Sequence, residues 1–253
     1  SEGGVTDEVA DAWGALYEEL AGLLIELEDH RYQEFAQREG GWRGTRTFRI
    51  GATHQESSVI RSFVLVPEDG EPVADFTPGQ YIGVRLMIEG VPVYRHYSLS
   101  ASPNGKHYRL SIKREPDGRA SRHLHDALGV GDTLELLPPA GELTLGEGDA
   151  PLMLISGGVG QTPMLPLAAQ ALEQGREVVY LHAAQERAQH AFADELASLQ
   201  ASYPEHLTSG VSPHQPVKLY YFVFTRSMVL TFHQALVESD IQTDFNDMDP
   251  ETM

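Results

Sequence analysis

The sequence predicts a multidomain α+β protein in which one long helix precedes an antiparallel β-barrel and a parallel α/β domain. Three observations lead to this prediction. Apolar residues recur at helical spacing over residues 6–38, short strand patterns separated by turn residues occupy 43–137, and buried strands alternate with helices from residue 151 onward. The 253 residues suffice for two ordinary domains with buried cores.

The composition excludes several classes of protein. The absence of cysteine rules out disulfides, thiolate-bound zinc, iron–sulfur clusters and cysteine nucleophiles. With 18 Lys and Arg against 37 Asp and Glu, the net charge of −19 argues against nucleic-acid partners and anionic membrane surfaces. No apolar run reaches the roughly 20 residues of a membrane span, and the first residues lack the pattern of a signal peptide. We therefore expect a cytoplasmic protein with no membrane and no nucleic-acid partner.

The first element is a helix over residues 6–38. Thr6 is the expected N-cap, two acidic residues follow it, and Gly40 and Gly41 end the pattern. Its apolar stripe must pack against other residues. These belong either to the rest of this chain or to a domain of which this is the last helix. We favour the second. The stripe consists of Val9, Trp13, Leu16, Leu20, Leu23, Leu24 and Leu27.

The short strand patterns and turns of the second region, residues 43–137, predict an antiparallel barrel or sandwich of about 100 residues. Its separators are rich in Gly, Pro, Asp and Asn, as at 67–70 and 103–105. The strand candidates are residues 45–50, 62–66, 81–86, 107–112 and 133–137.

The third region alternates strands and helices, which is typical of a parallel α/β layer. The continuous apolar runs at 152–156 and 178–181 indicate strands buried on both faces. Helices are expected at 164–174 and 191–199, and the tail offers a strand at 218–224 followed by a helix at 228–237.

A first candidate motif lies in residues 95–100, Arg-His-Tyr-Ser-Leu-Ser. An arginine can pair with phosphate, a tyrosine can stack on a flat ring, and a hydroxyl can bond a ring nitrogen, so the segment suits a flat phosphorylated ligand. The alternative is an ordinary exposed end of a strand.

A second candidate motif, Gly157-Gly-Val-Gly-Gln-Thr162, directly follows a buried strand. Glycines let the backbone approach a ligand, Thr162 is expected to cap the next helix, and free amides at a helix start attract phosphate. Pro163 stands where a Rossmann fingerprint has its last glycine, so this is a different loop. The alternative is a tight strand–helix turn without a ligand.

Taken together and in this order, the two motifs resemble the ferredoxin–NADP reductase superfamily, and more narrowly the flavohaemoglobins, which are nitric oxide dioxygenases with a globin fused ahead of a reductase. The resemblance covers residues 6 to about 200. Further segments support the resemblance. Residues 11–17 are similar to the last globin helix, and residues 40–45 are similar to the globin–reductase junction. The remaining matching segments are 79–81, 112–115, 118–121, 139–141, 182–184 and 190–195.

The resemblance implies three units: a terminal globin-type helix at 1–40, a Greek-key FAD-binding β-barrel at 41–148, and an NAD(P)-binding α/β domain at 149–253. It also implies an FAD-dependent NAD(P)H reductase that passes electrons to a globin haem or an external acceptor. Haem itself is not expected to bind this chain, because the haem-bearing globin helices are absent from the sequence.

The resemblance assigns site residues as well. Arg95 would bind the FAD pyrophosphate, with His96 beside it. Tyr97 would stack on the isoalloxazine and Ser98 would bond its N5, which makes these two the catalytic candidates. Tyr81 would flank the ribityl or adenine side, and the backbone from Gly118 to Ser121 would meet the pyrophosphate. The nicotinamide nucleotide would lie on Gly157, Gly158, Val159, Gly160, Gln161 and Thr162. No metal site is expected, since His123 and His125 lack a third partner.

The tail departs from the family. Laying residues 218–228 on the family's strand puts Phe222-Val223-Phe224 where a Cys-Gly-Pro would lie over the nicotinamide, and Phe224 would then obstruct the cofactor. The rival interpretation is therefore a non-catalytic, truncated flavin-binding remnant unable to use nicotinamide. The choice of NADH or NADPH also stays open, since Arg187 favours a 2′-phosphate and the adjacent Glu186 opposes it.

Overall fold

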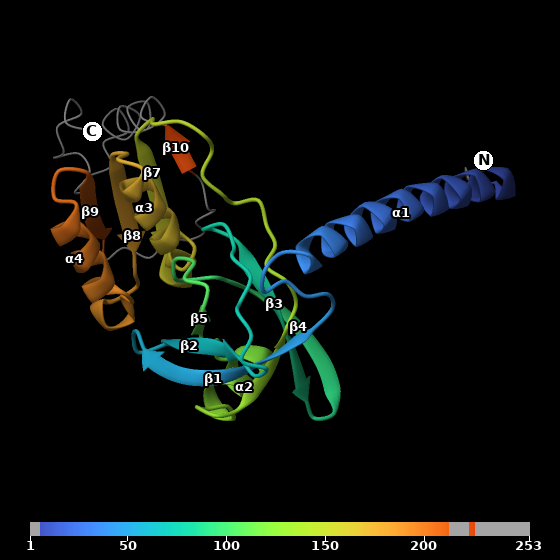
Figure 1. The fold of residues 1–253 in the computed structure, drawn as a ribbon, viewed down its shortest axis with the longest axis horizontal. Helices are drawn as coiled ribbons and strands as arrows, with labels where there is room; N and C mark the ends of the chain where they lie inside the picture. Colours follow the sequence, from blue (N-terminus) through green and yellow to red (C-terminus); the bar gives the residue numbers. More distant parts are fainter. Residues whose placement is uncertain (1–5, 213–222, 226–253) are drawn as a thin grey trace, which may run out of the picture.

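The computed structural model describes residues 6–212 and 223–225. A long helix projects from a body made of two units, a barrel built of β1–β6 and a layered unit that carries α3 and α4 (Figure 1). This arrangement confirms the expected fold class.

Helix α1 (Asp7–Ala36) nearly coincides with the helix expected at 6–38. The Thr6 hydroxyl accepts a hydrogen bond from the Val9 amide at 3.4 Å, as a cap should. Phe35 is the only buried side chain of α1, and it packs edge-on against Trp42 with ring centroids 5.5 Å apart. Trp42 in turn donates to the Leu136 carbonyl at 3.1 Å, which anchors the carboxyl end of α1 to the barrel.

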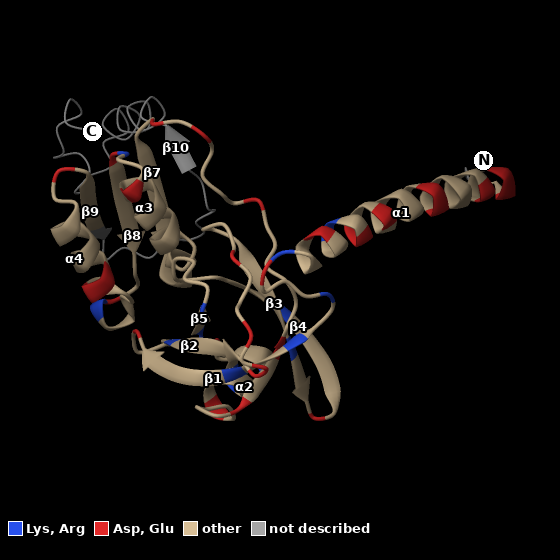
Figure 2. Cartoon of the chain, viewed as in Figure 1, with Lys and Arg blue, Asp and Glu red and all other residues tan. Residues whose placement is uncertain are grey.

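Beyond its last turns, where Asp29 pairs with Arg43 and Tyr32 is half-buried, α1 is uncovered by the described residues. Trp13 is 67% exposed and Leu24 is 66% exposed, so the expected apolar stripe has no cover among the described residues. Acidic residues recur along the whole helix (Figure 2). Among the described residues, no helix combines the length and the apolar character that crossing a bilayer requires.

The barrel is antiparallel, and its strand order is β4-β3-β6-β1-β2-β5. An isolated bridge between Leu99 and Leu110 brings the two edges of this sheet together. The non-sequential order agrees with the Greek-key arrangement that the resemblance implies. The elements are β1 (Arg46–Gln55), β2 (Ile60–Pro67), β3 (Tyr81–Ile88), β4 (Val91–Ser98), β5 (Tyr108–Lys113), α2 (Arg119–Asp126) and β6 (Thr133–Leu136).

Strand β4 was not among the strands expected from the sequence. Only Val93 of its eight residues is buried, so the alternation that marks a half-buried strand is missing. A tight turn at Glu89 and Gly90, both with positive φ, folds β4 back onto β3. The pairing with β3, rather than a buried face, therefore holds β4 in place.

The second unit has a parallel core, β7-β8-β9, with β10 added antiparallel to β7. The sequence did not indicate β9, whose Leu-Thr-Ser-Gly-Val-Ser contains no apolar run. The elements are β7 (Leu152–Gly157), the 3-10 turn η1 (Gly158–Gln161), α3 (Met164–Glu173), β8 (Val178–Ala183), the 3-10 turn η2 (Arg187–Gln189), α4 (Ala193–Ser202), β9 (Leu207–Ser212) and β10 (Val223–Thr225).

The direction of β10 contradicts the placement expected for Phe224. The backbone of Phe224 pairs with Met153, and that of Thr225 with Leu152, at the amino end of β7. The glycine loop follows the carboxyl end of β7, where a parallel strand would have ended. Phe224 therefore does not take the family's glycine position. Residues 218–222 and 228–237, for which a strand and a helix were expected, lie outside the described residues.

The two units are joined through the start of β2. Ile60 is only 1% exposed and belongs to the hydrophobic core of the second unit, although its strand is part of the barrel. Nearby, the Ser58 amide donates to the Ala188 carbonyl at 2.8 Å. These contacts bring β5 and η1 together, so the end of the barrel lies beside the glycine loop.

Candidate functional site

Strand β4 presents the first motif as an open polar surface. Its register on β3 puts Tyr97 opposite Ile82 and Ser98 opposite Tyr81. Arg95 and His96 are exposed, while Tyr97 and Ser98 are half-buried. The Tyr81 ring lies against the His96 ring, with centroids 4.8 Å apart and planes inclined by 37°. Tyr81, His96 and Ser98 thus share one face of this strand pair, whereas Arg95 and Tyr97 alternate to the other face, where Tyr97 packs against the barrel core.

Arg95 is available to an anion. Its guanidinium donates to the neighbouring Tyr94 carbonyl at 2.7 Å, and within the described part of the chain it forms no ion pair. Arg85, on the adjacent strand, is by contrast already paired with Glu135. Burial raises the pKa of the Tyr97 phenol, against the opposing effect of Arg95, so Tyr97 keeps its proton at neutral pH and can donate it.

The turn before α2 is shaped by Gly118 and Ser121. The Ser121 hydroxyl accepts from the Glu115 amide at 3.2 Å and donates to the Gly118 carbonyl at 3.3 Å. A Cβ on Gly118 would lie 2.3 Å from that hydroxyl oxygen, so only glycine fits here. Because Ser121 is engaged in holding the turn, the free backbone amides of the first helical turn are the groups left for a phosphate.

The second motif divides into an accessible half and a buried half. Gly157, Gly158 and Val159 are half-exposed, whereas Gly160, Gln161 and Thr162 are buried. Gly158 has a φ of +53° and open space where a Cβ would be, so glycine serves the backbone conformation at this position.

The expected cap at Thr162 is wrong. Pro163 is the N-cap of α3, and no side chain caps the helix. The Thr162 hydroxyl instead donates back to the Val159 carbonyl at 3.0 Å. This bond is available because η1 curls the chain into a 3-10 turn before α3 begins, which brings the hydroxyl over residue 159. Thr162 therefore fixes the loop from inside.

The accessible half of the loop faces a cleft of about 200 Å³ between the two units. The cleft lies at the carboxyl ends of β7 and β8, the position where open parallel sheets bind ligands. Sequence reasoning gave no role to Lys113 or Gln185, which also line it. Lys113 belongs to 112–115, which matched the family, and that was the signal that could have pointed to it. The cleft is lined by Gly157, Gly158, Val159, Ala183, Ala184, Gln185, Gln189, Val59, Ile60 and Lys113.

His182 lies behind this loop, and its buried Nε2 has no hydrogen-bond partner among the described residues. Its Nδ1 is 2.9 Å from the Ser156 hydroxyl, and its ring stacks on His190 at 5.3 Å. Burial, with a smaller contribution from His190, lowers the pKa of His182 to about 4, so the imidazole is neutral at physiological pH. His125 is likewise engaged, since its Nε2 lies 2.8 Å from the Ile112 carbonyl.

Comparison with known families assigns both units to the same class of protein. Residues 47–145 match the family described as "Oxidoreductase FAD-binding domain", and residues 154–233 match "Oxidoreductase NAD-binding domain". The chain is thus an oxidoreductase of the type that pairs an FAD-binding barrel with an NAD-binding domain.

Individual relatives identify the family within this class of oxidoreductases. The flavohemoprotein of Pseudomonas putida is 53% identical over 200 residues, which is 79% of this chain and 51% of that protein. The flavohemoprotein of Pseudomonas aeruginosa is 50% identical over the same extent. A crystal structure of the flavohem-like FAD/NAD-binding domain of nitric oxide dioxygenase from Vibrio cholerae is 38% identical, with a TM-score of 0.64 over 70% of this chain and 83% of that one. The chain therefore belongs to the flavohaemoprotein family, and it corresponds to the reductase domains of that family. It spans about half the length of the curated relatives that it matches.

One further structure bears on α1. The flavohemoglobin of Malassezia yamatoensis, only 22% identical, shares the fold with a TM-score of 0.75 over 96% of this chain and 68% of that one. The unmatched 4% amounts to about ten residues, fewer than the 30 residues of α1. Helix α1 therefore has a counterpart in a flavohemoglobin fold.

The role of Arg95 can be tested directly. We expect Arg95→Ala to weaken FAD binding about ten- to a hundredfold, because a charge-assisted phosphate bond contributes about 1.5–3 kcal/mol. Arg49→Ala removes an exposed arginine from another strand of the same barrel, where it pairs with Glu68, and should leave the affinity unchanged. Fluorescence titration of apoprotein with FAD measures both variants. Equal affinity in Arg95→Ala and wild type would refute the assignment.

Proposed function

We propose that this chain is an FAD-dependent reductase that oxidises NADH or NADPH and passes the electrons on one at a time. The observation that carries the proposal is the cleft in which the barrel residues Ile60 and Lys113 face Gly157 and Gly158 of the loop, because it places the end of the barrel beside the glycine loop. We further propose domain limits of 1–40, 41–148 and 149–253. The family matches at 47–145 and 154–233, which fall inside the last two units, support these limits.

The barrel residues fit FAD. Arg95 is an unpaired cation within the described residues, and the α2 turn offers free amides at a position that only glycine can occupy. Both groups suit the pyrophosphate. In this proposal Tyr97 packs against the isoalloxazine, and the Ser98 hydroxyl bonds the ring edge. Tyr81 and His96, already in contact with each other, flank the remainder of the cofactor. When bound, FAD supplies the hydride-accepting and electron-releasing chemistry.

The loop residues fit a dinucleotide. Gly157, Gly158 and Val159 line the cleft, while Gly160, Gln161 and Thr162 are buried and the Thr162 hydroxyl holds the loop from that side. Lys113 is 2.9 Å from Glu115 and lies at the same cleft, where it can exchange that partner for a nucleotide phosphate. Closing such a cleft over a nucleotide excludes water from the reacting atoms.

A competing proposal is a flavin-binding remnant that cannot use nicotinamide. The reversed direction of β10 favours it, because among the described strands none runs parallel to β7 on that side and ends beside Gly157. The two proposals differ in one measurable step, namely the reduction of bound flavin by NADH or NADPH.

That step provides the test. We expect anaerobic mixing of the FAD-loaded chain with NADH or NADPH to bleach the flavin absorbance. Lys113→Ala should raise the nucleotide concentration needed for half-maximal rate roughly five- to tenfold, since a partly exposed cation contributes about 1 kcal/mol. Lys106→Ala, in an exposed turn away from the cleft, is the matched control. A yellow protein that neither nucleotide bleaches would support the remnant instead.

We also propose the electron acceptor. The apolar stripe of α1 is uncovered by the described residues, and α1 has a counterpart in a flavohemoglobin fold. A haem globin packed on this stripe, as a partner of the reductase, is the acceptor that these two observations support. The activity named for the Vibrio cholerae protein, nitric oxide dioxygenase, would then belong to the assembly of both parts. A cytoplasmic location completes this proposal.

Substitutions on α1 test the acceptor. With the haem-loaded globin half of the Pseudomonas putida relative as probe, Leu20→Glu should slow NADH-driven haem reduction about tenfold or more, because a buried leucine contributes about 1.5–3 kcal/mol. Flavin reduction should not change. Glu18→Gln, on the opposite side of the helix by its spacing, is the control. If both variants reduce haem equally fast, the stripe is not the docking surface.

A further inference from the structure

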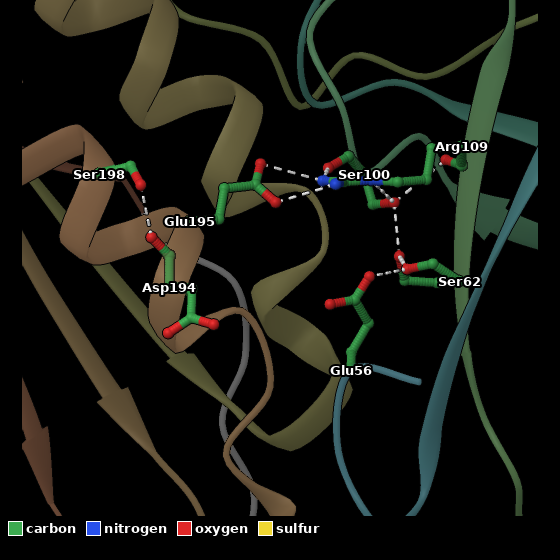
Figure 3. Close-up of polar contacts among 8 residues, drawn as sticks. Glu56, Ser62, Ser100, Arg109, Asp194, Glu195 and Ser198 are labelled. Carbon is green, nitrogen blue, oxygen red and sulfur yellow. Dashed lines mark hydrogen bonds and ion pairs between the residues drawn. The ribbon is translucent and has the colours of Figure 1, made fainter. Parts of the chain in front are cut away.

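Arg109, the second residue of β5, connects the two domains through its guanidinium group. Its Nη1 and Nη2 donate to the two carboxylate oxygens of Glu195 at 2.9 and 3.0 Å, and Glu195 belongs to α4 of the other domain (Figure 3). The guanidinium carbon also lies 5.5 Å from the centre of the Phe192 ring. The arginine side chain is 17% exposed and that of Glu195 is 38% exposed, so the guanidinium is largely shielded from solvent while the carboxylate is partly exposed.

The same guanidinium also binds Ser100, two residues after the end of β4. Its Nε donates to the Ser100 hydroxyl at 3.2 Å, and Nη2 also donates to the Ser100 carbonyl. Ser100 follows Ser98, the expected flavin ligand, by two residues. One side chain therefore contacts both the flavin-binding strand segment and a helix of the nucleotide domain.

Ser100 is held in turn by a buried row of hydroxyl groups. The Ser100 and Ser111 oxygens are 2.7 Å apart, as are those of Ser111 and Ser62, and Ser62 donates to Glu56 at 2.5 Å (Figure 3). These three serines are at most 3% exposed. Because each is fixed by its neighbours, the barrel side of the connection cannot shift without breaking several buried hydrogen bonds.

We infer that Arg109 and Glu195 are positioning residues that set the placement of the nucleotide domain relative to the flavin-binding strand. The effect that this inference predicts on catalysis rests on the proposed function. Hydride transfer needs the reacting atoms about 3–3.5 Å apart, and a displacement of about 1 Å can cost roughly a hundredfold in rate. The two domains also meet where Ile60, with Val59, Leu143 and Leu145, packs in the core of the nucleotide domain, and at the Ser58–Ala188 hydrogen bond. The apolar part of this contact is non-directional, and in this proposal the two charge-assisted hydrogen bonds of the pair fix the angle between the domains.

The test uses the full 253-residue chain and breaks the pair with Glu195→Gln or Glu195→Ala. The matched control is Asp126→Asn, which breaks the bidentate pair between Arg114 and Asp126, at 2.9 and 2.8 Å, inside the barrel domain. The first readout is hydrogen–deuterium exchange at residues 56–60, including the Ser58 amide, in protein without nucleotide. We expect faster exchange there in the Glu195 variants and no change in the control.

The second readout is flavin reduction by NADH or NADPH. The rate at saturating nucleotide should fall roughly ten- to a hundredfold in the Glu195 variants, while FAD affinity and nucleotide affinity change less than about twofold. A purely stabilising contact would not separate rate from affinity in this way. Unchanged exchange at 56–60, or an unchanged saturated rate, would overturn the inference.

The two failures can be told apart. If wild-type flavin is not reduced by either nucleotide, the proposed function fails, and the exchange measurement alone then decides whether the pair holds the domains together. If wild type is reduced rapidly and the Glu195 variants equally so, the proposed function stands and the positioning role is refuted.

Discussion

The burial of Ile60, a barrel residue, in the core of the nucleotide domain joins two folding units that each carry half of the candidate site. Burying such a side chain contributes about 1.5–3 kcal/mol, and because the hydrophobic effect is non-directional it does not by itself fix an orientation. Orientation needs directional bonds, and the structure supplies them at Arg109 and Glu195. The glycine loop and the end of the barrel, with the cleft between them, take their relative positions from this interface.

Each half of the site is shaped by a local constraint. Strand β4 buries only Val93, so Arg95 and Ser98 stay accessible to a ligand, while Tyr97 packs partly against the barrel core and the pairing with β3 keeps the strand aligned. On the other side, the 3-10 turn and the Thr162 hydroxyl fix a loop whose residues Gly157 and Gly158 line the cleft. Both halves therefore offer polar groups that are already held in place, which reduces the cost of binding a cofactor.

Much of the fold and of the candidate site was predictable because these features depend on local sequence pattern. Helix α1, the buried strands β7 and β8, and the two motifs follow from periodicity and turn residues. Strands β4 and β9 were missed because neither carries an apolar pattern of its own. Thr162 was assigned a cap it does not form, and Phe224 was assigned to a strand of the wrong direction, because the sequence encodes neither the 3-10 turn nor strand polarity. The pair of Arg109 and Glu195 joins residues 86 positions apart, and nothing local singles out one carboxylate among 37 acidic residues.

The central claim is that nicotinamide held at the glycine loop delivers a hydride to flavin held on the barrel. The most direct test is anaerobic flavin reduction by NADH carrying deuterium at one or the other of its two C4 positions. If the cleft binds the nucleotide in one orientation, one label should slow the reduction severalfold and the other should leave it almost unchanged. Equal rates with both labels, or no reduction of the flavin at all, would contradict this account.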